Sequence, residues 1–226
     1  MRDRSGSESP LAGKPPGGRR AVARLAVLGG AFNPPHIGHL VLAQEAAFQL
    51  ELDEVLLVPA REAPHRRIDP EPGAEVRLEM TRLAAAGDDL AIASDLEIAR
   101  PGPSYSYRTL ELLSEQRPGD EIWFLMGADV AAELDRWRRT ERVLELARVG
   151  IAARPGTAID DAEAALERLG AADRADILRM PELAVSSTRI RRRVAEGRPI
   201  RYLVPAPVEA LIRERGLYRE REGAVV

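Results

Sequence analysis

The sequence predicts an α/β domain in which helices flank a parallel β-sheet, with a small helical extension at the C-terminus. Two observations favour this class. Short apolar runs alternate with stretches of helical apolar spacing, and most of the runs are apolar at successive residues rather than at every second one. A strand buried on both faces gives such a continuous run. Strands that alternate with helices form right-handed βαβ units.

Six apolar runs are expected to be strands. The first ends at the pair Gly29–Gly30 and the second at Pro59, both of which are residues that interrupt strands. The runs are Leu25–Leu28, Val55–Val58, Leu90–Ser94, Ile122–Met126, Val149–Ala152 and Ala175–Leu178.

Seven stretches are expected to be helices, from apolar spacing and terminal signals such as the acidic start at Asp161. They are His39–Leu50, Val76–Ala86, Tyr107–Gln116, Glu141–Ala147, Asp161–Leu169, Ser187–Glu196 and Val208–Arg215. Ligands of parallel sheets bind beyond the carboxyl ends of the strands. We therefore expect the chemistry in the loops that follow Leu28, Val58, Ser94 and Met126.

Composition narrows the class of function. The 226 residues are 45% hydrophobic and carry a net charge of only −3, which favours neither nucleic acid nor a membrane surface as a partner. The absence of cysteine excludes disulfides, thiolate catalysis and cysteine zinc sites. No apolar run approaches the roughly 20 residues of a membrane span, and no signal peptide is visible. A cytoplasmic protein is expected.

Residues 1–22, rich in Arg, Ser, Gly and Pro, are expected to be a disordered tail, and residues 23–226 a single domain. Lys14, in that tail, is the only lysine, so no active-site lysine is expected. No Gly-Lys-Ser/Thr sequence exists, which excludes a P-loop.

The first cluster of chemical interest is the loop Gly29–His39. Its glycines allow a phosphate to approach the backbone, and the following helix would direct free N–H groups to the same place. His36 and His39 are three residues apart, so both can face one side of the helix. By residue chemistry alone, the pair is compatible with phosphate binding, with a metal site or with a structural turn.

The second cluster is Ser186–Arg193. Ser and Thr before a helical run are good N-caps, and arginines one turn later suit a polyphosphate. An ordinary capped helix with a solvated basic face would have the same composition.

Both clusters resemble signatures of the nucleotidylyltransferase superfamily. Gly29–His39 resembles its histidine-x-glycine-histidine signature, and Val185–Arg191 resembles the second signature, nearer the C-terminus. The intervening segments 59–66, 104–110 and 126–137 are similar to those of bacterial nicotinate-nucleotide adenylyltransferases. The resemblance covers about Leu25 to Arg219.

The resemblance implies a Rossmann-like fold and adenylyl transfer from ATP to nicotinate mononucleotide, which gives deamido-NAD and pyrophosphate in NAD biosynthesis. It implies that His36, His39 and Arg191 are catalytic, the histidines acting on the charge at the α-phosphate. The ATP-binding residues that it implies are Gly29, Gly30, Ala31, Phe32, Gly127, Asp129, Arg154, Ser187 and Thr188.

A separate group is expected to bind the mononucleotide. Trp137 would stack on the pyridine ring, and backbone N–H groups near Ser106, Tyr107 and Arg138 would receive the nicotinate carboxylate. The further members of this group are Asn33, His65, Arg66 and Tyr105.

Four positions depart from the family pattern. Ala31 replaces the usual Thr or Ser, and Asn33 stands where Asp is frequent. Arg66 replaces Lys, and Arg108 stands where Asp or Gln is common. None of these changes deletes a residue that the reaction needs.

The resemblance implies ATP and nicotinate mononucleotide as partners, with Mg²⁺ carried by ATP and no metal held by the protein itself. The sequence is compatible with a homo-oligomer. Alternatives are a sister enzyme such as the pantetheine-phosphate enzyme, a nicotinamide-preferring enzyme, or a non-catalytic nucleotide-binding protein on the same fold. A Rossmann dehydrogenase is less favoured, because the first loop is not Gly-x-Gly-x-x-Gly.

Overall fold

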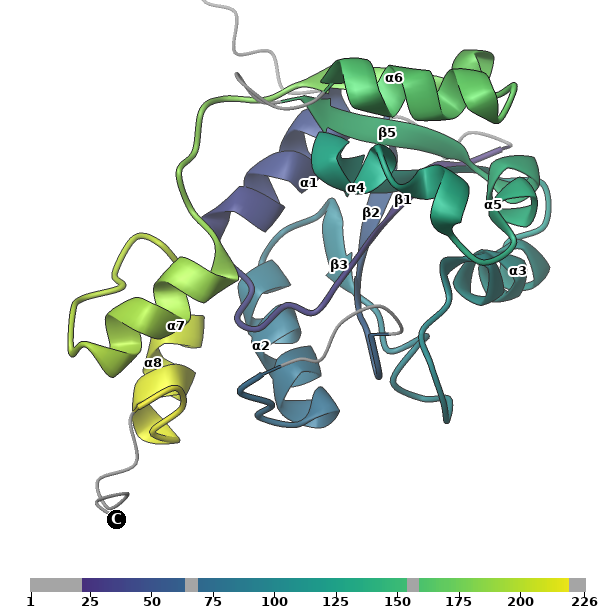
Figure 1. Cartoon of the computed structure of the whole chain (residues 1–226). Helices are drawn as coiled ribbons and strands as arrows, with labels where there is room; N and C mark the ends of the chain where they lie inside the picture. Colours follow the sequence, from purple (N-terminus) through teal and green to yellow (C-terminus); the bar gives the residue numbers. More distant parts are fainter. Residues whose placement is uncertain (1–21, 64–68, 154–158, 220–226) are drawn as a thin grey trace, which may run out of the picture.

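A computed structural model of the chain describes residues 22–63, 69–153 and 159–219 (Figure 1). Over these residues six strands form one fully parallel sheet, in the order β3-β2-β1-β4-β5-β6. The strands are β1 (Arg24–Gly30), β2 (Glu54–Pro59), β3 (Ala91–Ala93), β4 (Glu121–Gly127), β5 (Arg148–Ala153) and β6 (Ala175–Arg179).

The direction in which successive strands are added to the sheet reverses between β1 and β4. From β1 the sheet grows through β2 to β3 on one side and through β4 to β6 on the other. Leu28 of β1 pairs with Leu57 of β2 and with Leu125 of β4, so the loops after these three strands leave the sheet at one edge. Ligands of open parallel sheets bind at such a reversal. The predicted Rossmann-like sheet is confirmed.

Two layers of helices cover the sheet, and the strands carry apolar residues for both. In β1, Leu25 and Val27 belong to one buried cluster, whereas Ala26 and Leu28 belong to the other. The first cluster packs under α3, α4, α5 and α6, and the second under α1. The helices are α1 (Ile37–Gln49), α2 (Ala74–Ala85), α3 (Ser106–Gln116), α4 (Ala128–Ala131), α5 (Thr140–Leu146) and α6 (Ile159–Arg168).

The C-terminal extension consists of α7 (Ser187–Ala195) and α8 (Ala206–Glu214). These helices form a third apolar cluster, in which Ile190 of α7 and Val208 of α8 are buried together with Met80 of α2. Helix α2 thus bridges the sheet and the extension, as Figure 1 shows. The extension lies beside the carboxyl edge of the sheet through this contact and through the bonds to the loop after β1 that are described below.

Most predicted elements lie where the apolar pattern places them, with small shifts at their ends. Helix α1 begins at Ile37 rather than His39, which makes His36 its N-cap. Strand β3 is shorter than the predicted Leu90–Ser94. The short helix α4 and the 3-10 turns Leu134–Arg136 and Ala172–Arg174 were not predicted, because three or four residues give no apolar period.

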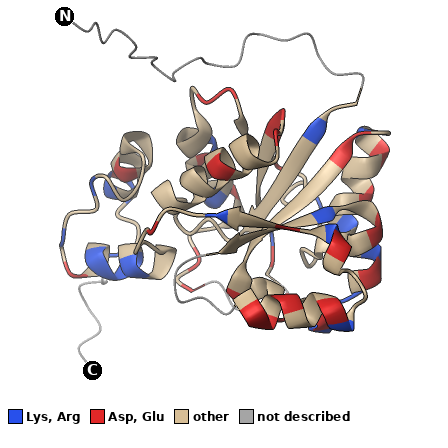
Figure 2. Cartoon of the chain, turned by 90° about the horizontal axis from the view of Figure 1, so that it is seen from above, with Lys and Arg blue, Asp and Glu red and all other residues tan. Residues whose placement is uncertain are grey.

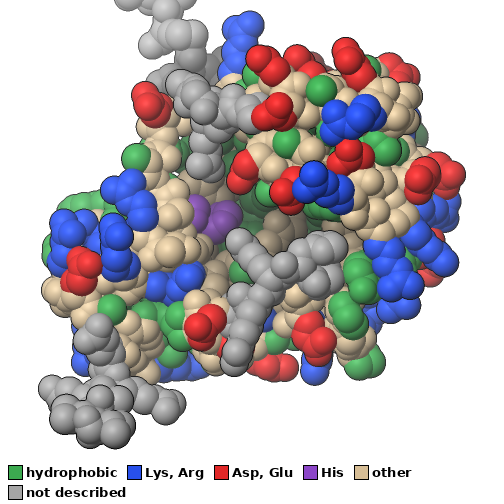
Figure 3. Space-filling view, in the orientation of Figure 1, with side chains coloured by type: hydrophobic (Ala, Val, Ile, Leu, Met, Phe, Trp, Pro, Cys, Tyr) green, Lys and Arg blue, Asp and Glu red, His purple; other side chains and the backbone are tan. Residues whose placement is uncertain are grey.

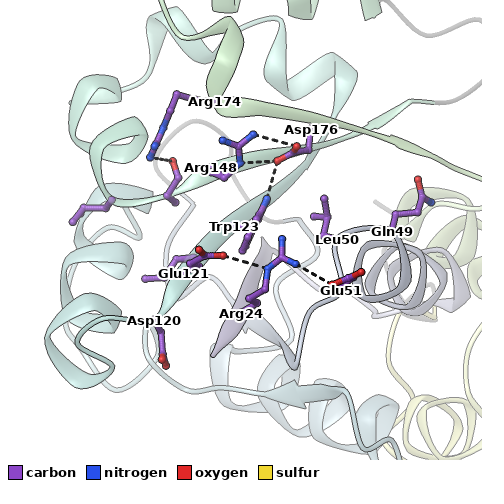
Figure 4. A pocket seen from close by; sticks show the side chains of 13 residues that line it. Arg24, Gln49, Leu50, Glu51, Asp120, Glu121, Trp123, Arg148, Arg174 and Asp176 are labelled. Atoms are coloured by element: carbon purple, nitrogen blue, oxygen red, sulfur yellow. Dashed lines mark hydrogen bonds and ion pairs between the residues drawn. The ribbon is translucent and has the colours of Figure 1, made fainter. Parts of the chain in front are cut away.

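A cavity of about 800 Å³ lies at the opposite, amino-terminal edge of the sheet (Figure 4). Several of its charged groups are paired with one another. Arg148 donates to both carboxylate oxygens of Asp176, and Trp123 Nε1 donates to the same carboxylate at 2.9 Å. Nε of Arg24 lies 3.2 Å from Oε2 of Glu121. This pairing stabilises the starts of β1, β4, β5 and β6, far from the loops in which the sequence places the chemistry.

No helix among the described residues is both long enough and apolar enough to cross a membrane. The predicted tail falls almost wholly outside the described residues, as do His65, Arg66 and Arg154.

Candidate functional site

The loop after β1 brings two imidazoles together at the start of α1. The rings of His36 and His39 stack with centroids 3.7 Å apart and planes at 22°. The backbone N–H of His36 donates to Nδ1 of His39 at 3.1 Å. Because this nitrogen accepts, the proton of a neutral His39 is on Nε2, which is then a donor suited to a phosphate oxygen.

The N-terminus of α1 is itself suited to an anion. Its first turn contains no acidic residue, so the partial positive charge of the helix end is not neutralised within the helix. Gly38 lies in close packing at this point. A Cβ added there would lie 3.0 Å from Val185 and 3.1 Å from the His36 ring. A side chain at this position would therefore press on the imidazole and on the segment that leads into α7.

The second predicted cluster lies against the first. Ser187 Oγ donates to the carbonyl oxygen of Pro34 at 2.8 Å, and Arg191 donates to the carbonyl oxygen of Asn33 at 2.8 Å. Arg191 also reaches Thr188 Oγ1 at 3.4 Å. These contacts join residues 153 and 158 positions apart. Two helix N-termini thus meet at one loop.

The capping of α7 follows the sequence prediction. Ser186 is the N-cap, and its hydroxyl accepts the N–H of Arg189 at 3.3 Å. This bond satisfies one of the free N–H groups of the first turn. Ser187 and Thr188 then begin the helix at the loop after β1, with Arg191 one turn later.

Asn33 was expected to contact the mononucleotide, but its side chain is buried and bonded within the protein. Its side chain is only 2% exposed. The amide Nδ2 donates to the carbonyl oxygen of Pro70 at 2.8 Å, and Oδ1 accepts the hydroxyl of Tyr218 at 2.5 Å. In this structure Asn33 fixes the loop rather than presenting its amide to a ligand.

The side chain of Phe32 is also buried, at 1% exposure, with its ring 4.8 Å from that of His39. Its predicted contact with ATP is therefore confined to the backbone. Asp129 is exposed in the first turn of α4. Its carboxylate lies over Gly127, where an added Cβ would come within 2.5 Å of Oδ1. A side chain at position 127 would force this carboxylate to move from its present position.

Five of the predicted mononucleotide residues lie near the start of α3 or in the segment before α5: Tyr105, Ser106, Tyr107, Trp137 and Arg138. Tyr105 is the N-cap of α3, so Ser106 and Tyr107 present the free N–H groups of a first helical turn, although the Tyr107 ring is buried. Arg138 lies over the Tyr105 ring at 5.1 Å. Trp137 is half-buried and packs edge-on against Phe124, with centroids 5.8 Å apart. This set combines an aromatic surface with N–H donors.

Glu97 supports this side of the site and was missed from the sequence, where it is one acid among many. It is 7% exposed and accepts the Thr109 hydroxyl at 2.6 Å. Burial raises the pKa of the Glu97 carboxyl, against the opposing effects of its bonds to Thr109 and Ser104 and of the charge of Arg100. The carboxyl ties the start of α3 to the segment that precedes it.

The charge around the site is uneven. Basic side chains gather on the C-terminal helices, whereas acidic ones concentrate on the helices that flank the sheet (Figure 2). The histidine surface, purple in Figure 3, lies in the hollow between the C-terminal helices and the sheet. No three His, Asp or Glu residues among the described segments are placed to hold a metal ion. The imidazoles, helix N–H groups and guanidinium at the hollow are donors that suit an anion.

Comparison with known proteins agrees with this geometry. The sequence model of the cytidylyltransferase-like family matches residues 27–193. The chain is 45% identical over 197 residues to a probable nicotinate-nucleotide adenylyltransferase of Roseiflexus sp. strain RS-1, covering 87% of this chain and 98% of the relative. A relative of the same description from Thermus thermophilus is 42% identical over 196 residues, with 87% and 100% covered.

The chain belongs to the cytidylyltransferase-like family, and within it to the nicotinate-nucleotide adenylyltransferases. It is thus an enzyme of the nucleotidyltransferase class. Among solved structures, the nicotinic acid mononucleotide adenylyltransferase of Plasmodium falciparum complexed with NaAD has the same fold, with a TM-score of 0.71 at 18% identity over 87% of this chain and 97% of that one. At this identity the likeness concerns the fold alone.

Proposed function

We propose that this nicotinate-nucleotide adenylyltransferase transfers the adenylyl group of ATP to nicotinate mononucleotide, with release of pyrophosphate. One observation carries the assignment of the chemistry to residues. The helix N-termini that hold His36 and His39 on one side, and Ser187 and Arg191 on the other, meet at the loop after β1. N–H groups, imidazoles and a guanidinium converging on one point favour a polyphosphate.

The reaction is an in-line displacement at phosphorus. A phosphate oxygen of the mononucleotide forms a bond to the α-phosphorus of ATP, and the bond from that phosphorus to the bridging oxygen of pyrophosphate breaks. The electron pair of the broken bond leaves with pyrophosphate. Because the attacking oxygen is already anionic near neutral pH, the reaction needs no strong base, and catalysis consists of positioning and electrostatic stabilisation.

Each part of the site then has a role in the proposal. His36 and His39 stabilise charge at the α-phosphate, and Ser187, Thr188 and Arg191 hold the β- and γ-phosphates. Mg²⁺ carried with the triphosphate would be held mainly by phosphate and water oxygens, and it would supply positive charge there. The donors of the site bind the phosphates that hold the ion.

The substrate side accounts for a preference for nicotinate. A carboxylate only accepts hydrogen bonds, whereas a carboxamide also brings N–H donors. The N–H groups of Ser106 and Tyr107 at the start of α3 would oppose the donors of the amide. Such mismatches of buried polar groups give large discrimination. Trp137 supplies the aromatic surface for the ring.

The test is pyrophosphate release with ATP, Mg²⁺ and either nicotinate or nicotinamide mononucleotide. Strong release with nicotinate mononucleotide alone supports the whole proposal. Equal release with both mononucleotides supports adenylyl transfer but rejects the proposed preference for nicotinate. Release with neither rejects the assigned acceptor.

His39→Ala tests the assignment to residues. It should lower turnover roughly 10²–10³-fold, by analogy with the loss of one preorganised donor to a transition state. Glu163→Ala, on the exposed face of α6, is the control and should leave turnover unchanged. Near-normal turnover of His39→Ala would remove the histidine from the mechanism.

A further inference from the structure

A fully buried arginine lies between the loops of the site. Arg77, in the first turn of α2, has 0% exposure. A guanidinium is costly to bury unless its N–H groups find acceptors. Nothing in the sequence distinguishes this arginine from the many others, because its position also fits a solvated helix face.

The acceptors of Arg77 come from three different segments. Its Nη1 donates to the carbonyl oxygens of Ala31 at 3.0 Å and Ala60 at 2.6 Å, and its Nη2 donates to that of Arg61 at 3.1 Å. Its Nε donates to Glu71 Oε1 at 2.9 Å. One planar group thus binds the loop after β1 and the loop after β2 together.

These two loops belong to the two halves of the proposed site. Ala31 lies in the loop that ends in His36 and His39. The backbone N–H of Arg61 donates to Ser104 Oγ at 2.9 Å, which continues the connection to the segment that leads into α3. A direct backbone bond, from the N–H of Ala60 to the carbonyl of Gly30 at 2.8 Å, lies beside the guanidinium.

We propose that Arg77 is a positioning residue that fixes the distance between the ATP side and the mononucleotide side of the site. The proposal rests on the proposed function for its kinetic consequence. Arg77 touches no substrate. It acts through the carbonyls of Ala31, Ala60 and Arg61, and so through the placement of the two loops. A displacement of about 1 Å between reactants can reduce a rate roughly 10²-fold.

Arg77→Lys is the decisive variant. Lysine keeps the positive charge, but its donors diverge from one nitrogen and cannot match the rigid fork that reaches four acceptors. We expect kcat to fall roughly 10²-fold while KM for either substrate changes less than about threefold, because each half of the site remains intact and only their relation changes. Arg82→Lys, the same substitution at an exposed position of α2, is the matched control and should leave kcat unchanged.

Amide hydrogen exchange supplies a readout that does not depend on catalysis. In Arg77→Lys, exchange should accelerate about tenfold or more in peptides covering 30–33 and 60–63, and remain unchanged in β5 and α6. If the wild-type enzyme turned over neither mononucleotide, the proposed acceptor would fail, whereas the exchange result would still decide the role of Arg77.

Two results would overturn the proposal: a kcat within twofold of the wild type, or exchange that rises uniformly over the whole fold. Should Arg77→Lys not fold, Glu71→Gln is the second variant. It weakens the ion pair between Arg77 and its half-exposed partner Glu71 by removing the negative charge. Glu71→Gln should then give a smaller loss of kcat together with faster exchange in the same two loops. Unchanged kcat and exchange in that variant would also reject the role.

Discussion

The hydroxyl of Tyr218 donates to Oδ1 of Asn33 at 2.5 Å, across 185 positions of the sequence. Burial raises the pKa of the Tyr218 hydroxyl, so it stays protonated and remains a donor over the whole physiological range. Because Nδ2 of Asn33 donates to Pro70 at the same time, the amide is held from both ends. The C-terminal extension is thus bonded directly to the loop that carries His36 and His39.

Removing this bond should weaken both the fold and ATP binding. Tyr218→Phe leaves the buried Oδ1 of Asn33 without its donor, which costs about 1–3 kcal/mol in the free energy of unfolding. We also expect KM for ATP to rise severalfold, because Tyr218 joins the loop after β1 to the extension that carries Ser187 and Arg191, so its loss loosens the phosphate-binding half itself. Urea unfolding and steady-state kinetics measure the two effects. Tyr202→Phe is the control, since Tyr202 is 79% exposed.

Gly38→Ala should separate stability from activity. Alanine is the better helix former by about 1 kcal/mol, so helix propensity alone would stabilise the variant. The new Cβ would, however, lie 3.1 Å from the His36 ring and 3.0 Å from Val185. We expect a thermal midpoint close to that of the wild type and a kcat that falls at least severalfold. A fully active variant would show that the imidazole tolerates displacement.

Glu97 should make stability depend on pH. Its pKa is higher in the folded protein than the ordinary 4.5, because of burial. Folding therefore favours the protonated form, and the stability that it contributes is present below pH 4.5 and lost as pH rises through the folded pKa. Glutamine resembles the protonated acid at every pH.

The difference in thermal midpoint between Glu97→Gln and the wild type should thus grow in favour of the variant as pH rises from 4.5 towards neutrality. Differential scanning calorimetry across that range measures it. Glu163→Gln, on the exposed face of α6, controls for the loss of one negative charge. A difference that is constant with pH would contradict the assigned effect of burial.

Trp137 should act on the mononucleotide and not on ATP. Loss of an aromatic surface that stacks on a base costs about 1–3 kcal/mol, so Trp137→Ala should raise KM for nicotinate mononucleotide roughly 5–150-fold. Trp137→Phe retains a ring against Phe124, so its KM for nicotinate mononucleotide should lie between those of the wild type and of Trp137→Ala. Equal changes in KM for both substrates would point to a general loss of packing instead.

The sheet and its order of helices were predictable because buried parallel strands are uniformly apolar. The run Leu25–Leu28 lies within β1, and the cluster Ser186–Arg193 gives the capped start of α7. The two histidines were expected on one side of a helix start, and their rings stack there. The roles that we assign to these residues in binding remain predictions.

What the sequence could not reveal are contacts whose partners are backbone carbonyls. Nothing in the residue pattern around Arg77 marks it as buried, because carbonyls leave no trace in a sequence. The family resemblance implied that Asn33 contacts the mononucleotide, yet in the structure Tyr218 and Pro70 bond to both ends of its amide. Such assignments depend on the tertiary fold.

The bond between Tyr218 and Asn33 has a consequence for the order of events during synthesis. The loop after β1 is made first, and the partners that hold it in place, Ser187, Arg191 and Tyr218, are translated 153 or more residues later. The sheet can collapse while the ribosome is still adding α7 and α8. We therefore expect a nascent chain to lack a complete phosphate site until α7 and Tyr218 have been added, because only these residues bond the loop after β1 from the extension.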